Sequence, residues 1–248
     1  MKWFSLKGFI IIPVLIASCR TTQVPSKAQF EDYRITTALS KDTSLIILTQ
    51  PYRDSVDRSM NEVVGFADKT LDKKQPEGTL GNFMVDALYY GAKQHFGITP
   101  DAAVVNNGGI RLTQLPAGPV TRGKVFELMP FDNLVVIQKV KGDVLQQFLD
   151  LAAQSKGWPV HGIKMQIKDK KAVNVTVNGS PLDPNKTYTL VNSDYLANGG
   201  DNAIMLKAIP QQNIGYLMRD ALFDYIKSLR AEGKNISANE QKRVENAQ

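Results

Sequence analysis

The chain has 248 residues, of which 43% are apolar and 22% are charged, as in an ordinary globular domain with a sizeable core. Its net charge of +6 is scattered, and the densest basic stretches, Lys69–Lys74 and Lys168–Lys171, contain no aromatic residues. A nucleic-acid groove combines positive charge with stacking side chains, so the composition argues against nucleic acid as a partner. With a single cysteine, Cys19, the chain cannot form an internal disulfide.

Residues 1–18 are predicted to be a lipoprotein signal peptide. Lys2 and Lys7 accompany an apolar run over residues 8–16 that is too short to span a bilayer, and small residues follow directly before Cys19. A cysteine at this place resembles the bacterial lipobox, in which it is lipidated and becomes the new N-terminus. Several acyl chains would hold the protein on a membrane of the bacterial cell envelope. The alternative is an ordinary signal peptide with an accidental cysteine.

Residues 19–42 then read as the lipidated cysteine and a polar tether, residues 43–232 as one domain, and residues 233–248 as a polar, frayed tail. Apolar residues recur every four positions from Leu48 to Met60, which predicts a helix over 43–60 that Pro51 should bend or delay. Further helices are expected at 79–95, where Thr79 can form the N-cap, after Gly142, and at 212–231.

Short apolar runs predict strands at 61–68, 101–105, 134–140, 162–167, 172–177 and 187–191. Asn178-Gly179 is a tight-turn signal directly after the fifth of these. Strands interspersed with amphipathic helices indicate an α/β or α+β fold, in which a mixed sheet is flanked by helices and a pocket lies at strand ends.

Three loop segments carry side chains suited to a flat, polar, anionic ligand: 106–111 (NNGGIR), 130–133 (PFDN) and 194–201 (DYLANGGD). Arg111 follows two glycines and can bind phosphate bidentately, although a structural salt bridge is as good an interpretation. Phe131 could be a core residue, whereas Tyr195 lies beside glycines, where a core residue is unexpected. Asp201 can accept two ribose hydroxyl groups or cap the following segment.

In order and spacing these segments resemble the C-terminal, substrate-binding domain of the bacterial and animal 5'-nucleotidases, over about residues 61–206. The resemblance implies that Arg111 binds the substrate phosphate, that Asn106 contacts the base, and that Asp201 holds the ribose. It also implies that Phe131 and Tyr195 stack on the two faces of the base.

Three positions depart from the family pattern. Asn107 stands where the family commonly has glycine, and Tyr195 where it often has phenylalanine. Residues 77–82 resemble the family's helix-entry motif, and just upstream of it the family tends to carry a second phosphate-binding arginine. Lys74 is the nearest equivalent in this chain, and it keeps the charge without the bidentate geometry.

The family's metallophosphatase domain has no counterpart in this sequence. A two-metal phosphatase site needs about six to eight ligands around ions ~3.5–4 Å apart, and this chain has two histidines, His95 and His161, in separate predicted elements. His95, near a helix C-terminus, is better explained structurally. We therefore expect no cofactor or metal in this chain, and two divalent metals in a partner.

The predicted function is the nucleotide- or nucleoside-binding module of a split 5'-nucleotidase, a hydrolase of nucleotide catabolism that would be inactive without a separate metallophosphatase chain. The main alternative is a stand-alone nucleotide- or nucleoside-binding lipoprotein without a hydrolytic role. A structural lipoprotein with a decayed pocket is the third interpretation.

Overall fold

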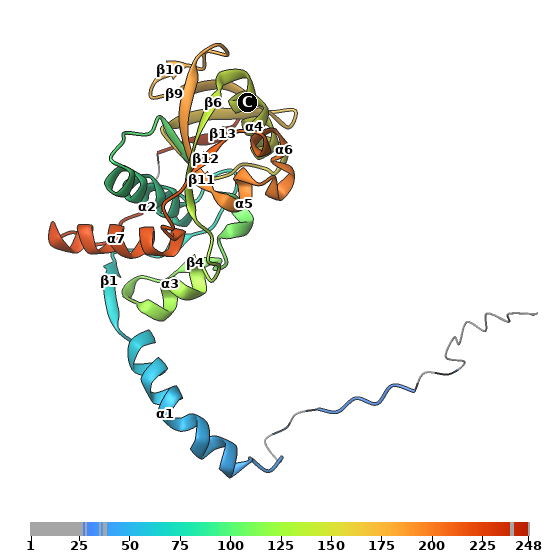
Figure 1. The fold of residues 1–248 in the computed structure, drawn as a ribbon, viewed down its shortest axis with the longest axis vertical. Coiled ribbons are helices and arrows are strands. Elements are labelled where there is room, and N and C mark those ends of the chain that lie inside the picture. Colours follow the sequence, from blue (N-terminus) through green and yellow to red (C-terminus); the bar gives the residue numbers. More distant parts are fainter. Residues whose placement is uncertain (1–26, 28, 35, 37–38, 239–240, 248) are drawn as a thin grey trace, which may run out of the picture. The chain divides into compact units, whose positions relative to one another are not determined.

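The computed structural model describes residues 27, 29–34, 36, 39–238 and 241–247 (Figure 1). The predicted signal peptide and Cys19 lie outside these residues. The chain divides into two units, residues 1–46 and 47–248. In the described part of the first unit Phe30, Tyr33 and Leu39 are exposed. The described residues include no helix that is both long and apolar enough to span a bilayer.

The second unit contains most of the secondary structure. The helices are α1 (Thr43–Met60), which begins in the first unit, α2 (Thr79–Phe96), α3 (Arg122–Leu128), α4 (Gly142–Gln154), α5 (Asp194–Ala197), α6 (Ile204–Lys207) and α7 (Met218–Ala231), with 3-10 turns η1 (Asn107–Gly109) and η2 (Gly200–Asn202). The strands are β1 (Val63–Ala67), β2 (Leu71–Asp72), β3 (Ala102–Val104), β4 (Gln114–Leu115), β5 (Gly118–Thr121), β6 (Val135–Lys141), β7 (Val160–His161), β8 (Ile163–Lys168), β9 (Lys171–Val177), β10 (Ser180–Pro181), β11 (Thr187–Ser193), β12 (Gln211–Gln212) and β13 (Val244–Asn246).

A five-stranded mixed sheet forms the centre of the domain, in the order β12-β6-β11-β3-β7. Strand β11 runs parallel to β3 and antiparallel to β6. A second sheet has the order β10-β9-β8-β13, and β1-β5 and β2-β4 form two-stranded sheets. Helices flank the central sheet (Figure 1), so the predicted α/β class with a mixed sheet is confirmed.

The central sheet separates two apolar cores, because successive residues of its strands point to opposite faces. Leu190 of β11 belongs to one core, and its neighbour Val191 belongs to the other. Helices α2 and α7 pack in the core that contains Val191. Helix α4 and the strands β8 and β9 enclose the core that contains Leu190. A sheet buried on both faces gives the loops at its edge a rigid base.

Two predicted helix starts differ from the structure. The N-cap of α2 is Gly78, and the hydroxyl of Thr79 instead accepts a hydrogen bond from the Asp72 N–H at 2.9 Å, so the prediction of Thr79 as the cap was wrong. Helix α7 begins at Met218 rather than near residue 212, because residues 211–212 pair with β6 and Gly215 takes a left-handed conformation at φ +75°. The first difference comes from a contact seven residues away in sequence, and the second from pairing with the distant strand β6.

Helix α1 has the predicted bounds, and it continues through Pro51 without a delayed start. None of its residues is buried, and Leu48, Tyr52 and Val56 are all exposed. The four-residue periodicity therefore predicted the helix correctly, but the stripe it forms is no part of the core.

Within the predicted polar tail, residues 244–246 form a strand instead of fraying. Strand β13 pairs in parallel with β8, and the guanidinium of the buried Arg243 donates to both carboxylate oxygens of Asp86 at 2.7 and 2.9 Å. Asp86 also contacts Nδ1 of His161 at 2.6 Å. Burial by itself would raise the pKa of Asp86, but the hydrogen bonds from His161 and Arg243 lower it below its usual value. The polar composition of this segment was therefore wrongly interpreted as solvent exposure.

Candidate functional site

The strand arrangement brings the three predicted loops to one edge of the central sheet. Strands β3 and β11 are parallel, so the turn after Val104 and the segment after Ser193 leave the sheet side by side. Strand β6 runs antiparallel to β11, and Val135 at its start pairs with Ser193. The loop that contains Phe131 therefore enters the sheet where the other two leave it.

The three loops enclose a cavity of 420 Å³. Five of the six binding residues predicted from the sequence line it, and three further residues complete the wall. The lining residues are Asn106, Gly108, Gly109, Arg111, Phe131, Asn133, Tyr195 and Asp201. Asn133 is one of these three residues, and its position in the wall adds it to the candidate ligand contacts.

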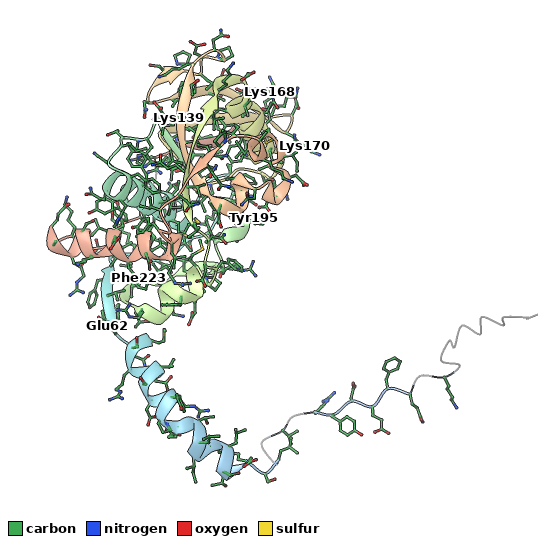
Figure 2. All side chains as sticks on the ribbon, viewed as in Figure 1. Glu62, Lys139, Lys168, Lys170, Tyr195 and Phe223 are labelled. Atoms are coloured by element: carbon green, nitrogen blue, oxygen red, sulfur yellow. The ribbon has the colours of Figure 1, made fainter. Side chains whose placement is uncertain are left out.

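Two aromatic side chains stand half-exposed at this cavity. Phe131 is 42% exposed and Tyr195 is 43% exposed, so neither belongs to a core. The guanidinium of Arg111 lies 5.5 Å from the centre of the Phe131 ring. The ring of Tyr195, in α5 (Figure 2), lies against the backbone of Gly200, where a Cβ atom would come within 2.5 Å of the ring. Large aromatic surface left exposed in a concave site is available to stack on a planar ligand.

Asp201 is held by both of its neighbours at the site. Its Oδ1 accepts a hydrogen bond from the hydroxyl of Tyr195 at 2.8 Å, and its Oδ2 accepts one from the Asn106 amide at 2.7 Å. The hydroxyl of Tyr195 in turn accepts from the Asp201 backbone N–H at 3.1 Å. The bond to the Asp201 carboxylate raises the pKa of Tyr195, so this hydroxyl stays protonated at neutral pH.

Asn106 is 6% exposed, and its amide nitrogen contacts Asp201. The backbone of Asp201 is left-handed at φ +50°, a conformation that aspartate tolerates better than most residues. These features place the carboxylate at the cavity wall and fix its direction without capping the following segment.

A second cation, Lys73, accompanies Arg111. The ammonium of Lys73 donates to the backbone oxygen of Ile110 at 2.8 Å, one residue before Arg111. Burial and the charge of Arg111 both lower the pKa of Lys73. Within the described residues no carboxylate forms an ion pair with either cation. Two neighbouring cations without an acidic partner favour an anionic ligand.

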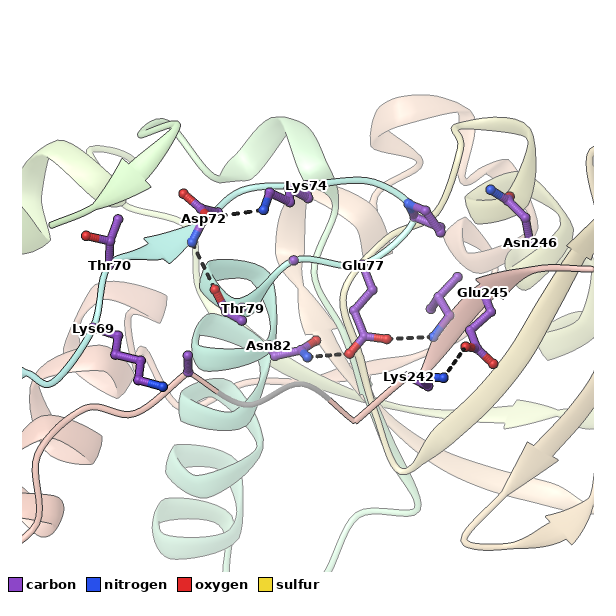
Figure 3. Close-up of a pocket in the computed structure, with 14 residues that line it drawn as sticks. Lys69, Thr70, Asp72, Lys74, Glu77, Thr79, Asn82, Lys242, Glu245 and Asn246 are labelled. Atoms are coloured by element: carbon purple, nitrogen blue, oxygen red, sulfur yellow. Dashed lines mark hydrogen bonds and ion pairs between the residues drawn. The ribbon is translucent and has the colours of Figure 1, made fainter. Parts of the chain in front are cut away.

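Lys74, the sixth predicted binding residue, is not brought to this cavity. It forms an ion pair with Asp72 at 3.2 Å and lines a different cavity of 520 Å³ beside the start of α2 (Figure 3). The hydrogen bond from the Lys73 N–H to the Thr113 oxygen extends the pairing of β2 and β4, and consecutive side chains of an extended segment point to opposite sides. The lysine beside Arg111 is therefore Lys73, and the alternation along residues 71–74 was the signal that could have found it.

The 520 Å³ cavity is the less suitable ligand site of the two. Two of its three lysines face acidic groups, with Lys74 paired to Asp72 and Lys242 lying 3.7 Å from Glu245. No aromatic residue lines it. Paired charges leave little net attraction for an ion, and there is no stacking surface for a base.

The metal-ligating residue types do not gather into a site in the described part of the chain. No group of three or more His, Cys, Asp or Glu residues there could hold a metal ion. His95 contacts Asp224 at 2.9 Å, and His161 contacts Asp86. These residues do not fit a two-metal phosphatase centre, and both histidines have structural partners.

Residues 61–208 match the family described as the 5'-nucleotidase, C-terminal domain. Protein UshA of Yersinia enterocolitica is 27% identical over 198 residues, which covers 77% of this chain and 36% of UshA. The cell wall protein Lmo0130 of Listeria monocytogenes is 28% identical over 241 residues, which covers 84% of this chain and 30% of that protein. The chain thus spans about a third of the length of these relatives.

A crystal structure of a 5'-nucleotidase precursor from Thermus thermophilus superposes with a TM-score of 0.70 and 27% identity. The superposition covers 82% of this chain and 42% of that one. The fold and the sequence therefore agree on the same relationship.

Proposed function

This chain belongs to the 5'-nucleotidase C-terminal domain family, and on that premise we propose that its 420 Å³ cavity binds a nucleotide or nucleoside. The observation that carries the proposal is the convergence on one cavity of two half-exposed aromatic rings, a held carboxylate and an arginine that has no acidic partner among the described residues. Each group suits one part of the ligand. The rings suit a base, the carboxylate a ribose, and the arginine a phosphate.

Phe131 and Tyr195 are the proposed clamp for the base. Stacking on an aromatic side chain contributes about 1–3 kcal/mol per base and accepts different bases, because every base has a π face. The cation next to Phe131 adds to this surface, since Arg111 lies near the ring.

Arg111 is the proposed phosphate ligand, assisted by Lys73. The lowered pKa of Lys73 reflects its burial and its repulsion by Arg111, and a bound phosphate would relieve that repulsion. The guanidinium can reach two phosphate oxygens in parallel, which a lysine cannot do. Lys73 would then contribute positive charge, and Arg111 would fix the orientation of the phosphate.

We assign the chemistry of hydrolysis to a separate partner chain. The described residues of this chain offer no metal site. A metallophosphatase with two divalent metals would act on the nucleotide that this module presents. The bacterial cell envelope, with Cys19 as the lipidated anchor, is the proposed location, in line with a relative that is named a cell wall protein. A stand-alone nucleotide binder without hydrolytic role uses the same cavity and differs only in lacking the partner.

Isothermal titration of the purified protein with AMP, adenosine and UMP tests the binding proposal. We expect saturable binding, and we expect Arg111→Ala to weaken AMP about tenfold or more while adenosine changes little, because only AMP carries the anion. Arg53→Ala, an exposed arginine in α1, is the control that should bind as the wild type does.

Two results would count against this assignment. Absence of binding for all three ligands would exclude the cavity as a nucleoside site. Equal losses of affinity for AMP and adenosine in Arg111→Ala would show that Arg111 does not bind the phosphate. Recovery of a secreted two-metal phosphatase with the tagged protein would favour the split enzyme over the stand-alone binder.

A further inference from the structure

The carboxylate of Asp201 is already bound on both of its oxygens before any ligand is present. The hydroxyl of Tyr195 donates to Oδ1 and the amide of Asn106 donates to Oδ2. A carboxylate oxygen has about two lone-pair sites, so each oxygen keeps about one acceptor site for a ligand. Two acceptor sites side by side match the two adjacent hydroxyl groups of a ribose.

The hydroxyl of Tyr195 makes two contacts with the same residue. It donates to the Asp201 carboxylate at 2.8 Å and accepts from the Asp201 backbone N–H at 3.1 Å. Together the two bonds fix both the backbone and the carboxylate of a residue that is exposed and left-handed. An exposed carboxylate without such bonds would rotate freely and lose conformational entropy on binding a ligand.

Building on the proposed nucleotide site, we propose that the Tyr195 hydroxyl is a positioning group that makes the site select ribose over 2'-deoxyribose. Phenylalanine supplies the same ring face for stacking, so the hydroxyl adds a function that stacking does not need. The Tyr195 hydroxyl holds the Asp201 carboxylate in an orientation that leaves one acceptor site free on each oxygen. A vicinal diol can then bind both sites, whereas a 2'-deoxyribose fills one and leaves the other without a donor.

The test compares Tyr195→Phe with the wild type by titration with AMP, UMP and their 2'-deoxy forms. The substitution removes one hydroxyl at a residue that is 43% exposed, and a melting curve confirms the fold. We expect the wild type to prefer the ribonucleotides. In Tyr195→Phe we expect their affinity to fall about three- to tenfold and that of the deoxy forms to change less, so the preference narrows.

Tyr52→Phe is the matched control, because it makes the same chemical change at a tyrosine in α1 that is 73% exposed and does not line the cavity. It should leave both affinities unchanged. The inference is overturned if Tyr195→Phe keeps the wild-type preference, loses both ligand types equally, or binds ribonucleotides more tightly. In each of these cases the inference about the Tyr195 hydroxyl is wrong, but the proposed function stands because nucleotides still bind. Failure of the wild type to bind any of the four ligands overturns the proposed function as well.

Discussion

The two aromatic residues of the cavity have equal exposure but different surroundings. Tyr195 is held through its hydroxyl by Asp201, whereas the ring of Phe131 has Arg111 beside it. Neither ring belongs to a core, so each can be removed without opening a cavity in the packed interior. The contribution of stacking can therefore be measured separately from the stability of the fold.

We expect Tyr195→Ala and Phe131→Ala each to weaken AMP and adenosine about five- to 150-fold, since each loses one stacking face of about 1–3 kcal/mol. Melting temperatures should stay close to that of the wild type, as for most exposed substitutions. Phe66→Ala removes a phenylalanine that is 50% exposed in β1, outside the cavity, and serves as the control for binding. Unchanged titrations for both site variants would exclude a stacking clamp.

Sequence reasoning at the level of single residues succeeded where a residue type and its loop position agreed. It named Asn106, Arg111, Phe131, Tyr195 and Asp201, which the structure brings to one cavity because the segments that carry them follow or precede neighbouring strands. Tyr195, predicted in a loop, lies in the short helix α5. Sequence reasoning also named Lys74, whereas the lysine beside Arg111 is Lys73, since the side to which a residue of this extended segment points depends on the pairing of β2 with β4. The contact of Asn106 with Asp201 spans 95 positions and left no local signal.

At the scale of elements, apolar periodicity predicted that a helix is present better than it predicted whether that helix is buried. It predicted α1 and α2 within a residue or so, yet α1 has no buried residue and α2 is largely buried. The start of α7 was misplaced because β12 takes the residues before it into the central sheet. The C-terminal strand β13 escaped prediction because its anchoring residue, Arg243, is charged and its ion-pair partner is in α2.

We expect Arg243→Ala to lower the free energy of unfolding by about 3 kcal/mol, because it leaves the carboxylate of Asp86 buried without its bidentate partner. The backbone N–H of Arg243 donates to Glu77 and keeps this bond in the variant, so the loss falls on the side-chain contacts with Asp86. Lys242→Ala is the neighbouring control, since Lys242 is 82% exposed and should change stability by less than about 0.5 kcal/mol. Urea unfolding measures both, and equal midpoints would contradict the structural role of the ion pair.

At the scale of the whole molecule, the described residues form a candidate ligand cavity and no group that could hold a metal ion. The chain matches about a third of the length of its relatives, and the domain that it has in common with them contains the candidate ligand cavity. Its two histidines face Asp224 and Asp86 rather than a shared ion site. The relationship to the family was predictable from the order of the motifs.

We therefore expect the purified protein to release no phosphate from AMP, even with added manganese or zinc, because two separated histidines cannot build a two-metal site. Phosphate assays across metal concentrations measure this, with inorganic phosphate recovery as the check on the assay. Metal-dependent release that disappears in His95→Ala or His161→Ala would show that the chain is an enzyme by itself.

The close approach of Gly200 to the Tyr195 ring also offers a practical tool. A methyl group at this position would collide with three ring atoms, while the charges of the cavity stay as they are. Gly200→Ala should therefore give a folded protein in which the Tyr195 ring is displaced from its place in the cavity. This variant can serve as a binding-deficient reference in living cells. Cells that carry it would separate the consequences of ligand capture from those of merely having the protein present.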